Sequence, residues 1–476
     1  MSGARIPWGV TCVIALSSAV VSFGDIGPDV IVNDLYDTAH YGPIGGIHGY
    51  SVGTESCNIG DTDLMWQSWN NHHPVIAQNM YRLKDGRIEQ IGISWLKHGF
   101  ITIDSGNCGI CPSGGTGDHL SPGCSDPYSA GLNGDRNRLG PRYQVNAATG
   151  VYTYPYDNSA PVDDVLDRRM QVHDDLVNPT LNPGALYFVE GEYVTQDDAA
   201  AGNNWNNCSY RRVSISTSST RTLTLRETVF QETPAIAAWH DHGLGIGVPD
   251  PGVTLAKVDV PNDGRFWVGA KATDNGDGTW HYEYAVQNIT SDRSGGYFSV
   301  AIASGATISG VGFKDIDYHS GEPFEPTDWS WEVSGGAIIW SSPQTYGENP
   351  NTNALRWGKL YNFWFDVDAP PVNGTATLGL FKPGTPETVG AYVFVPDASS
   401  SGCPNPGGSG DYCTADIVGD DCIVSIQDLA QLLSNYGMTS GATRADGDLY
   451  PPPNGDGAVS LEDLGALLAQ YGNDCN

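Results

Sequence analysis

The sequence contains few basic residues. Its 476 residues include 23 Lys and Arg against 55 Asp and Glu, which gives a formal net charge of −32. A chain of this charge repels nucleic acids and anionic lipids, so we expect no nucleic-acid partner. It attracts divalent cations, and its composition suits a calcium-rich exterior. A solvated acidic surface without bound cations would have the same composition.

Long apolar runs are also absent beyond the N-terminus. Residues 1–24 contain one basic residue, Arg5, then an apolar run and then small residues, which is the layout of a secretory signal peptide. We expect cleavage after Gly24, with Ala19 as the alternative position. No later segment has the ~20 apolar residues that a transmembrane helix needs. The sequence therefore predicts an exported chain that does not span a membrane.

Cysteine is present in modest number, and Cys12 would leave with the signal peptide. In an exported chain the remaining cysteines predict disulfides. Their number is odd, and we expect Cys208 to stay unpaired. Cys108 and Cys111 also fit a redox or zinc pair, but they lie in a Gly/Ser/Pro loop without a neighbouring βαβ pattern. The disulfide candidates are Cys57, Cys108, Cys111, Cys124, Cys403, Cys413, Cys422 and Cys475.

Helical periodicity is nearly missing from the body of the chain, residues 25–396. Short runs rich in β-branched and aromatic residues alternate there with Gly, Pro, Asn and Asp. Residues 280–286 alternate in polarity and predict a strand with one buried face, and Asn-Gly-Asp-Gly at residues 275–278 predicts a hairpin turn before it. We expect a mainly β fold, an antiparallel β-sandwich or jelly-roll-like body followed by a small α-helical C-terminal module.

Composition divides the chain into segments. A run of Ser, Gly and Pro predicts a linker between body and tail. The first part of the body is loop-rich and holds most of its cysteines, which leaves open whether the body is one domain or two. The expected segments are a signal peptide (1–24), a loop-rich, disulfide-containing β region (25–184), a β-sandwich region (185–396), the linker (397–412) and a C-terminal module (413–476).

The tail contains an internal repeat. Residues 428–437 and 463–472 share Asp, Leu, two central Leu, Tyr and Gly at equal spacing. The apolar residues recur at i, i+3, i+4 and i+7, which predicts two short amphipathic helices that end at glycine. Neither stripe can bury itself alone, so we expect the helices to pack on each other. The stripes are Leu429, Leu432, Leu433 and Tyr436, and Leu464, Leu467, Leu468 and Tyr471.

An acidic loop precedes each helix. Calcium requires hard oxygen ligands at defined spacing, with glycine at the sixth position of the loop. The second loop fits if residues 450–453 are an insertion, whereas the first is degraded because Cys422 replaces the glycine. The predicted ligands of the second loop are Asp448, Asn454, Asp456, the Ala458 carbonyl, Ser460 and Asp463. Those of the first loop are Asp416, Asp421, Ser425 and Asp428.

Two loop–helix units without entering helices, placed after a Ser/Gly/Pro linker, resemble a dockerin domain. The tail is similar in particular to the Cys-containing dockerin-like modules that end many secreted proteins of planctomycete-type bacteria. The resemblance covers residues 403–476. It implies Ca²⁺ as cofactor, calcium-dependent folding, and docking to a cohesin-like or other cell-surface component. The alternative is that calcium only holds the tail together and nothing docks.

The body offers several candidates for chemistry. A glycosidase needs two carboxylates at a defined separation, and Glu190, Glu192 and Glu283 lie on expected strands. His240 and His242 would share one face if their segment is a strand, as in some metal sites, but no third ligand can be assigned. We therefore assign no catalytic residue from the sequence.

The tryptophans are the remaining sequence feature that bears on ligand binding. Exposed Trp and Tyr can stack on sugar rings, but such residues more often fill the core between sheets. Trp329 and Trp331 alternate and are expected to share a strand face. The other tryptophans of expected strands and their flanks are Trp267, Trp340, Trp357 and Trp364.

These observations predict a secreted, non-catalytic surface or matrix protein with a glycan as its candidate ligand. It would be anchored or sorted through the calcium-dependent dockerin-like module at residues 413–476. The alternative is a secreted hydrolase that acts on polysaccharide and carries the same tail.

Overall fold

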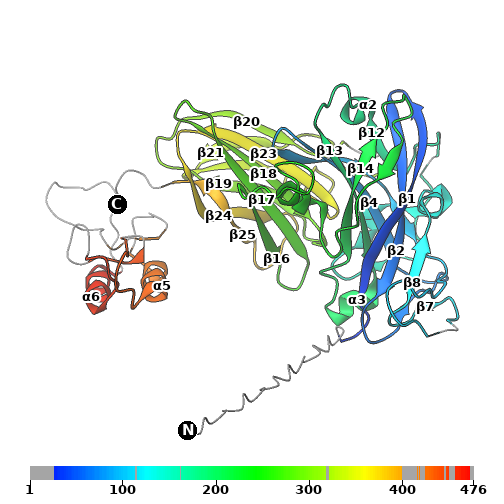
Figure 1. Cartoon of the computed structure of the whole chain (residues 1–476), viewed down its shortest axis with the longest axis horizontal. Helices are drawn as coiled ribbons and strands as arrows, with labels where there is room; N and C mark the ends of the chain where they lie inside the picture. The colour runs from blue at the N-terminus through cyan, green and yellow to red at the C-terminus, as the bar shows by residue number, and fades with distance from the viewer. Residues whose placement is uncertain are drawn as a thin grey trace, which may run out of the picture.

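The computed structural model describes residues 26–112, 115–160, 162–317 and 321–398 of the body, and residues 415, 417–418, 424–443, 446–449 and 456–471 of the tail (Figure 1). The expected signal peptide and nearly all of the linker lie outside these residues. The described chain is mainly β, and its sheets are antiparallel, which confirms that part of the prediction. No described helix is long and apolar enough to cross a membrane.

The first unit of the body contains two larger sheets and two short strand pairs. The four-stranded sheet consists of β1 (Val30–Ile44), β2 (Ile47–Asn58), β8 (Ser125–Tyr128) and β12 (Met170–His173). The seven-stranded sheet consists of β4 (Val75–Lys84), β5 (Arg87–Ile93), β6 (Leu96–His98), β9 (Leu139–Gly140), β13 (Leu186–Val194), β14 (Cys208–Ile215) and β15 (Leu223–Leu225). The short pairs are β3 (Leu64–Met65) with β7 (His119–Leu120), and β10 (Val145–Asn146) with β11 (Val151–Tyr152).

Apolar residues of both larger sheets form one core in this unit, among them Val52 on β2 and Val189 on β13. Helices in the body are short and lie in its connections. They are α1 (Ala130–Asn133), α2 (Asp174–Val177), α3 (Gln196–Ala201) and α4 (Ala238–Asp241), with 3₁₀ turns at Arg136–Arg138, Arg142–Gln144 and Ala235–Ala237.

The second unit consists of two five-stranded sheets. One has the order β16 (Val253–Asp259), β17 (Arg265–Asp274), β18 (Trp280–Asn288), β23 (Lys359–Val367) and β20 (Ile308–Lys314). The other has the order β21 (Ser330–Ser334), β22 (Ala337–Ser341), β19 (Gly295–Ala301), β24 (Pro371–Leu380) and β25 (Thr388–Pro396). Aromatic side chains from both sheets fill a common core, including Tyr284, Phe298, Trp340 and Phe363.

The hairpin predicted at residues 275–278 is present. It joins β17 to β18, which pair in register from Phe266 with Asn288 to Asp274 with Trp280. Gly276 and Gly278 both have positive φ, a conformation that glycine adopts without a steric penalty. The Asn-Gly-Asp-Gly sequence alone was therefore sufficient to predict the position of this turn.

The predicted boundary between residues 184 and 185 is wrong. The strand that follows it, β13, pairs along its whole length with β4 of the first part. β14 and β15 then extend the same sheet, so the sheets divide only before β16. The error arose because strand pairing over more than a hundred residues leaves no trace in local composition.

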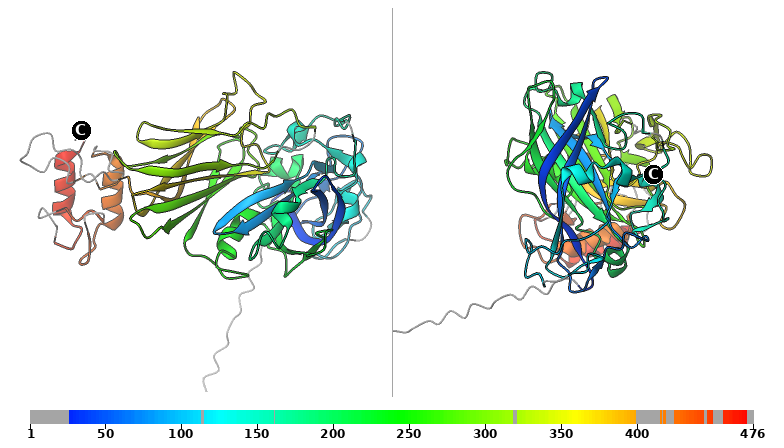
Figure 2. Two further views of the ribbon diagram at one scale, coloured as in Figure 1. Left: turned by 90° about the horizontal axis from the view of Figure 1, so that it is seen from above. Right: turned by 90° about the vertical axis from the view of Figure 1, so that its right-hand side faces the viewer.

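The expectation that β18 buries only one face is also wrong. Tyr282 and Tyr284 face the core of the second unit as predicted. Ala285, on the opposite face, has 0% exposure because it packs against the first unit, in a cluster with Tyr81 and Trp239. The two units lie against each other (Figure 2), and their shared cluster covers the face that an isolated sheet would expose to water.

Two helices form the described part of the tail, α5 (Ile426–Asn435) and α6 (Leu461–Gln470). Each begins at a serine whose side chain caps the helix, and an aspartate three residues later caps it in return. The inward residues of the predicted stripes, Leu432 and Leu467, have 0% exposure within one small core. The outer residues of those stripes remain exposed.

Candidate functional site

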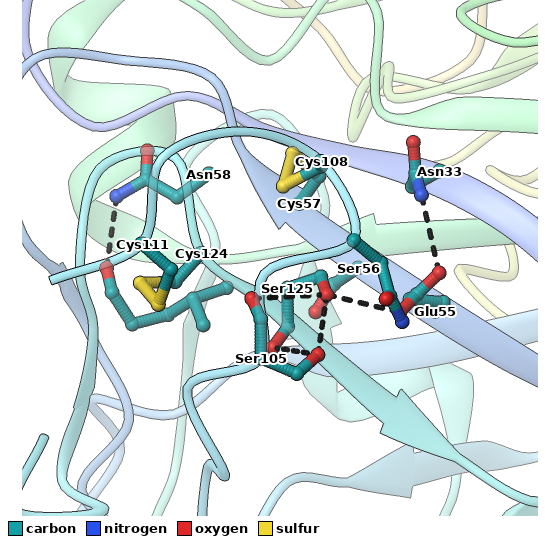
Figure 3. The surroundings of a disulfide bond; sticks show 12 residues. Asn33, Glu55, Ser56, Cys57, Asn58, Ser105, Cys108, Cys111, Cys124 and Ser125 are labelled. Carbon is teal, nitrogen blue, oxygen red and sulfur yellow. Dashed lines mark hydrogen bonds between the residues drawn. A yellow bond between two sulfur atoms is a disulfide. The ribbon is translucent and has the colours of Figure 1, made fainter. Parts of the chain in front are cut away.

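Two disulfides hold the loop before β8, one by linking it to β2 and the other by closing the loop just before β8 begins (Figure 3). They join Cys57 to Cys108 and Cys111 to Cys124. The four predicted body cysteines are thus paired, and the CxxC cysteines bond to different partners. Cys208 is free and buried, as predicted. The four predicted tail cysteines lie outside the described residues.

A buried polar network accompanies the first disulfide. The Glu55 carboxylate accepts hydrogen bonds from Asn107 Nδ2 at 2.6 Å, Ser125 Oγ at 2.9 Å and Asn33 Nδ2 at 3.1 Å. The hydroxyls of Ser105 and Ser125 are 2.6 Å apart (Figure 3). These contacts fix the disulfide-linked loop against β2 and β8.

Glu190 lies between the two units of the body. Its carboxylate accepts from Asn79 Nδ2 at 2.8 Å, Tyr81 OH at 2.8 Å and the Ala235 N–H at 2.6 Å. Gln287 Nε2, from β18 of the second unit, donates to it at 2.9 Å. A carboxylate with this many donors and 1% exposure is arranged to hold the two units together.

Glu192 is similarly buried, with 2% exposure. Burial raises the pKa of its carboxyl well above the ordinary range, the negative charge of Glu190 raises it further, and Arg142 opposes both. Its Oε1 has no hydrogen-bond partner within the described residues. Burial thus favours the neutral form of this carboxyl.

Glu283 is also a residue of the contact between the units. Its Oε2 lies 2.5 Å from Arg87 Nη2 of β5. The same carboxylate is 3.5 Å from His281 Nε2, and this contact together with Asp366 raises the pKa of His281. Glu283 has 4% exposure, so all three candidate carboxylates are buried instead of facing a substrate.

His240 and His242 lie in and directly after the short helix α4, so the strand assumed for them is wrong. His240 Nδ1 pairs with Asp241 Oδ1 at 3.0 Å. His242 Nδ1 accepts from the Gly247 N–H at 2.8 Å, and burial lowers its pKa. Each imidazole thus has its own local partner, and the structure does not bring the two together around a common ligand.

Most of the tryptophans of the expected strands are buried or half-buried. Trp329 has 4% exposure and precedes β21, whereas Trp331 on that edge strand has 48%. The expectation that these two share a strand face is therefore wrong. Trp340 and Trp357 are also buried, while Trp267 and Trp364 are half-buried beneath Lys257 and Arg87.

The most exposed described tryptophan lies outside the strands expected from the sequence. Trp69 is 61% exposed in the loop between β3 and β4. The hydroxyl of Tyr154, itself 39% exposed, donates to the Ser68 carbonyl at 3.0 Å. The loop is closed by a backbone bridge from Gln67 to His72. Two aromatic side chains with neighbouring amides are thus held on one part of the surface.

A small cleft of about 240 Å³ lies where the two units meet. His173 at the end of β12 pairs there with Asp317 across the junction, at 3.2 Å. Asp175 and Asp315 make the lining mostly acidic, against the single ammonium of Lys314. The volume is below the range typical of pockets that bind small organic ligands.

The second predicted calcium loop is partly described. Asp448 has 2% exposure, and its oxygens accept from the N–H groups of Asp456 and Gly457 at 3.0 and 2.7 Å. Asp463 has 0% exposure and accepts from Leu449 N at 2.7 Å, which brings its carboxylate to the start of the same loop. Ser460 Oγ donates to Asp463. Buried hard oxygens of this kind fit calcium, although three carboxylates do not converge within 4.8 Å among the described residues.

The first loop is less complete. Asp428 has 0% exposure and accepts from the N–H groups of Ile417, Val418 and Ser425 at 2.7 to 2.9 Å. Asp416, Asp421 and, in the second loop, Asn454 lie outside the described residues. Asp428 and Asp463 thus occupy equivalent positions and fold their loops in the same way.

The tail exposes apolar residues at equivalent positions of its repeat. On and after α5 these are Ile426, Leu433 and Tyr436, with 64%, 52% and 48% exposure. On and after α6 they are Leu461, Leu468 and Tyr471, with 68%, 52% and 45% exposure. Ile426 and Leu461 were missed in the sequence because they precede the repeated segment, although they are in register with it.

Comparisons with known proteins add little to this geometry. No protein-family model matches the sequence, and no curated protein matches it. One solved structure, the partial N-terminal region of an enterococcal surface protein, is similar over 81% of this chain and 98% of its own. The identity is 8% and the TM-score 0.14, values that support no conclusion about fold or function.

Proposed function

We propose that this is a secreted, non-catalytic surface or matrix protein, displayed outside the cell through a calcium-dependent, dockerin-like tail. Its body would be a two-unit β protein whose second unit is a β-sandwich. The three glutamates on which a hydrolase would depend are buried between and beneath the two units, which favours this proposal over the polysaccharide hydrolase.

The observation that carries the proposal is the duplicated set of exposed apolar residues on the tail. Single exposed apolar residues are common on proteins, whereas grouped ones are typical of interaction surfaces. Leu433 and Leu468 have the same exposure on the two helices, as Tyr436 and Tyr471 nearly do. A docking surface on a cohesin-like or other envelope component accounts for apolar residues conserved between the two halves of one chain.

Calcium would be held by Asp448, Asp456, Asp463 and Ser460 in the second loop, with Asn454 and the Ala458 carbonyl completing the predicted set. A bound cation would neutralise carboxylates that are otherwise buried together at the start of the helix. Its contribution is to fold the loop and fix α6 beside α5, and thereby to position the exposed apolar residues.

The proposal is tested by retention of the full-length chain on envelopes of its own cells. The variant carrying Leu433→Ser and Leu468→Ser should bind about thirtyfold more weakly, because losing the burial of two leucines at about 1 kcal/mol each amounts to ~2 kcal/mol. EGTA should release the wild-type chain. The measurement is the bound fraction as a function of protein concentration.

The matched control is Tyr392→Ser on β25, which removes a side chain of 68% exposure from the body. It should leave retention unchanged. Equal retention of the wild type and the double variant, or retention that survives EGTA, would refute docking through the tail and favour a calcium loop that only stabilises its own module.

A polysaccharide is the ligand that we propose for the body. The support is the exposed pair Trp69 and Tyr154, because flat aromatic faces stack on sugar rings. The hydroxyl of Tyr154 donates to the carbonyl of Ser68, the residue before Trp69.

Co-sedimentation of the full chain with insoluble polysaccharides tests this. Trp69→Ala should abolish pelleting, whereas Trp331→Ala, also exposed, should not. Soluble sugar released in the same tubes would instead support the hydrolase.

A further inference from the structure

Two aspartates flank the disulfide Cys111–Cys124 in the sequence, Asp104 before it and Asp126 after it on β8. Ser105 and Ser125 form an antiparallel bridge, with N–H to carbonyl bonds of 2.9 and 2.8 Å in both directions. The next pair outward in this register is Asp104 with Asp126. In such a non-hydrogen-bonded pair the two Cβ atoms are about 4.5–5.5 Å apart, so this register would place both side chains on the same face.

Most of the oxygens of this pair lack a partner. Asp126 has 1% exposure; its Oδ1 accepts from the Ile103 N–H at 2.7 Å, but its Oδ2 is buried without a hydrogen bond to any described residue. Both oxygens of Asp104 are likewise buried without a hydrogen bond within the described part of the chain. Leaving ionised carboxylates in this state costs several kcal/mol, so the site requires a counter-charge or a proton.

The positive charge of Lys97 offsets the charge of Asp126 only in part. Lys97 is buried in the same region, but its Nζ donates to the His98 carbonyl at 2.8 Å and lies over the rings of Phe100 and Tyr128. No ion pair joins Lys97 to either aspartate among the described residues. The sulfur atoms of Cys111 and Cys124 lie within 4.8 Å of a carboxylate oxygen of Asp104, but both are committed to the disulfide.

We propose that Asp104 and Asp126 bind a divalent hard cation of the calcium class beside the Cys111–Cys124 disulfide, as a site of the body separate from the tail. Three free carboxylate oxygens are the ligands that such a cation prefers, whereas zinc or copper would favour thiolate or imidazole. Calcium takes six to eight oxygens, so the remaining ligands must come from water or main-chain carbonyls. The cation would fix the loop to β8 next to the disulfide.

Equilibrium dialysis with calcium alone tests this on the full-length mature chain. Asp126→Asn, which keeps the shape of the side chain, should bind one calcium fewer per chain than the wild type, and so should Asp104→Asn. Asp118→Asn is the matched control, because this carboxylate lies on the same loop and is already hydrogen-bonded to Thr116 and His119. The tail is identical in all variants, so the difference reports on the body site even if the tail binds no calcium.

A second measurement does not depend on the folding of any variant. Calcium bound at this site should protect Cys111–Cys124 from dithiothreitol in the wild-type chain, about tenfold at ten times the dissociation constant. Peptide mapping separates this disulfide from the others. Equal calcium counts in the wild type and Asp126→Asn, or equal reduction rates with and without calcium, would overturn the proposal. A proton shared by the two aspartates would then account for the pair.

Discussion

Two buried histidines of the first unit, His73 and His98, have pKa values below the ordinary value for histidine. His73 has 2% exposure, and its Nε2 lies 2.9 Å from His98 Nδ1. Burial lowers the pKa of His73 to about 4, and the positive charges of Lys97 and His72 lower it further, against hydrogen bonds to the backbone of Gln67 and Asn70. Burial also lowers the pKa of His98 well below its usual value. Both imidazoles are thus neutral in the folded chain at neutral pH.

This predicts a loss of stability in mild acid. The unfolded chain binds a proton at His73 below its ordinary pKa of 6.5, whereas the folded chain does so only near pH 4. The stability present above pH 6.5 is therefore lost as the pH falls toward 4, by about 2 kcal/mol between pH 7.5 and 5 for this residue. Urea unfolding at the two pH values should show a smaller difference for His73→Gln than for the wild type. His72→Gln, which changes the half-buried neighbour, should retain most of the difference, because burial is the main cause of the shift at His73. An unchanged difference in His73→Gln would contradict the assignment.

At the scale of elements, β18 is buried on both of its faces and contacts both units of the body. One of its faces carries Tyr282 and Tyr284 into the core of the second unit, and the other carries Ala285 and Gln287 toward the first. The small Ala285 permits close approach of the first unit, while Gln287 reaches the Glu190 carboxylate at 2.9 Å. A strand buried on both faces tolerates neither added volume nor an unpaired polar group.

Ala285→Ser should therefore destabilise the protein by about 2 kcal/mol, because the hydroxyl enters a site with 0% exposure that lacks a designed partner. The same substitution at Ala301, exposed at the end of β19, should change stability by less than about 0.5 kcal/mol. Chemical denaturation of both variants gives the comparison. Equal effects would mean that the second face of β18 is not closed by the first unit.

At the scale of the whole molecule, the two units of the body share a core and several polar contacts. Trp239 has 0% exposure in the shared cluster, and its Nε1 donates to the Gly86 carbonyl at 2.8 Å. The ion pairs Arg87–Glu283 and Lys314–Glu89, at 2.5 and 2.6 Å, cross the same junction. An interface that combines a buried indole with partly buried, paired charges couples the stabilities of the units it joins.

We therefore expect the body to unfold in one calorimetric transition. Trp239→Ala should cost about 4 kcal/mol through the lost burial and the cavity left behind, and should separate the transition into two. Trp69→Ala, which removes an indole of 61% exposure, should leave a single transition near the wild-type temperature. Two transitions in the wild type would show that the units unfold independently.

The sequence by itself determined the local features of this protein. Alternating apolar residues specified strands, and Asn-Gly-Asp-Gly specified the β17–β18 turn. Each of these depends on residues within about ten positions of one another, where side-chain periodicity and backbone freedom act directly. The odd number of exported cysteines likewise pointed to an unpaired one, and Cys208 is free.

Only the tertiary structure decided which residues meet. Glu190 and Asn79 are 111 residues apart, yet their side chains are hydrogen-bonded because β13 pairs with β4. That pairing moved the boundary between the units, buried the three glutamates and closed the second face of β18. The register of Asp104 with Asp126 has the same origin, since one bridge between Ser105 and Ser125 sets it. Strand pairing links distant segments through backbone hydrogen bonds that any residue can make, so a single sequence does not encode it locally.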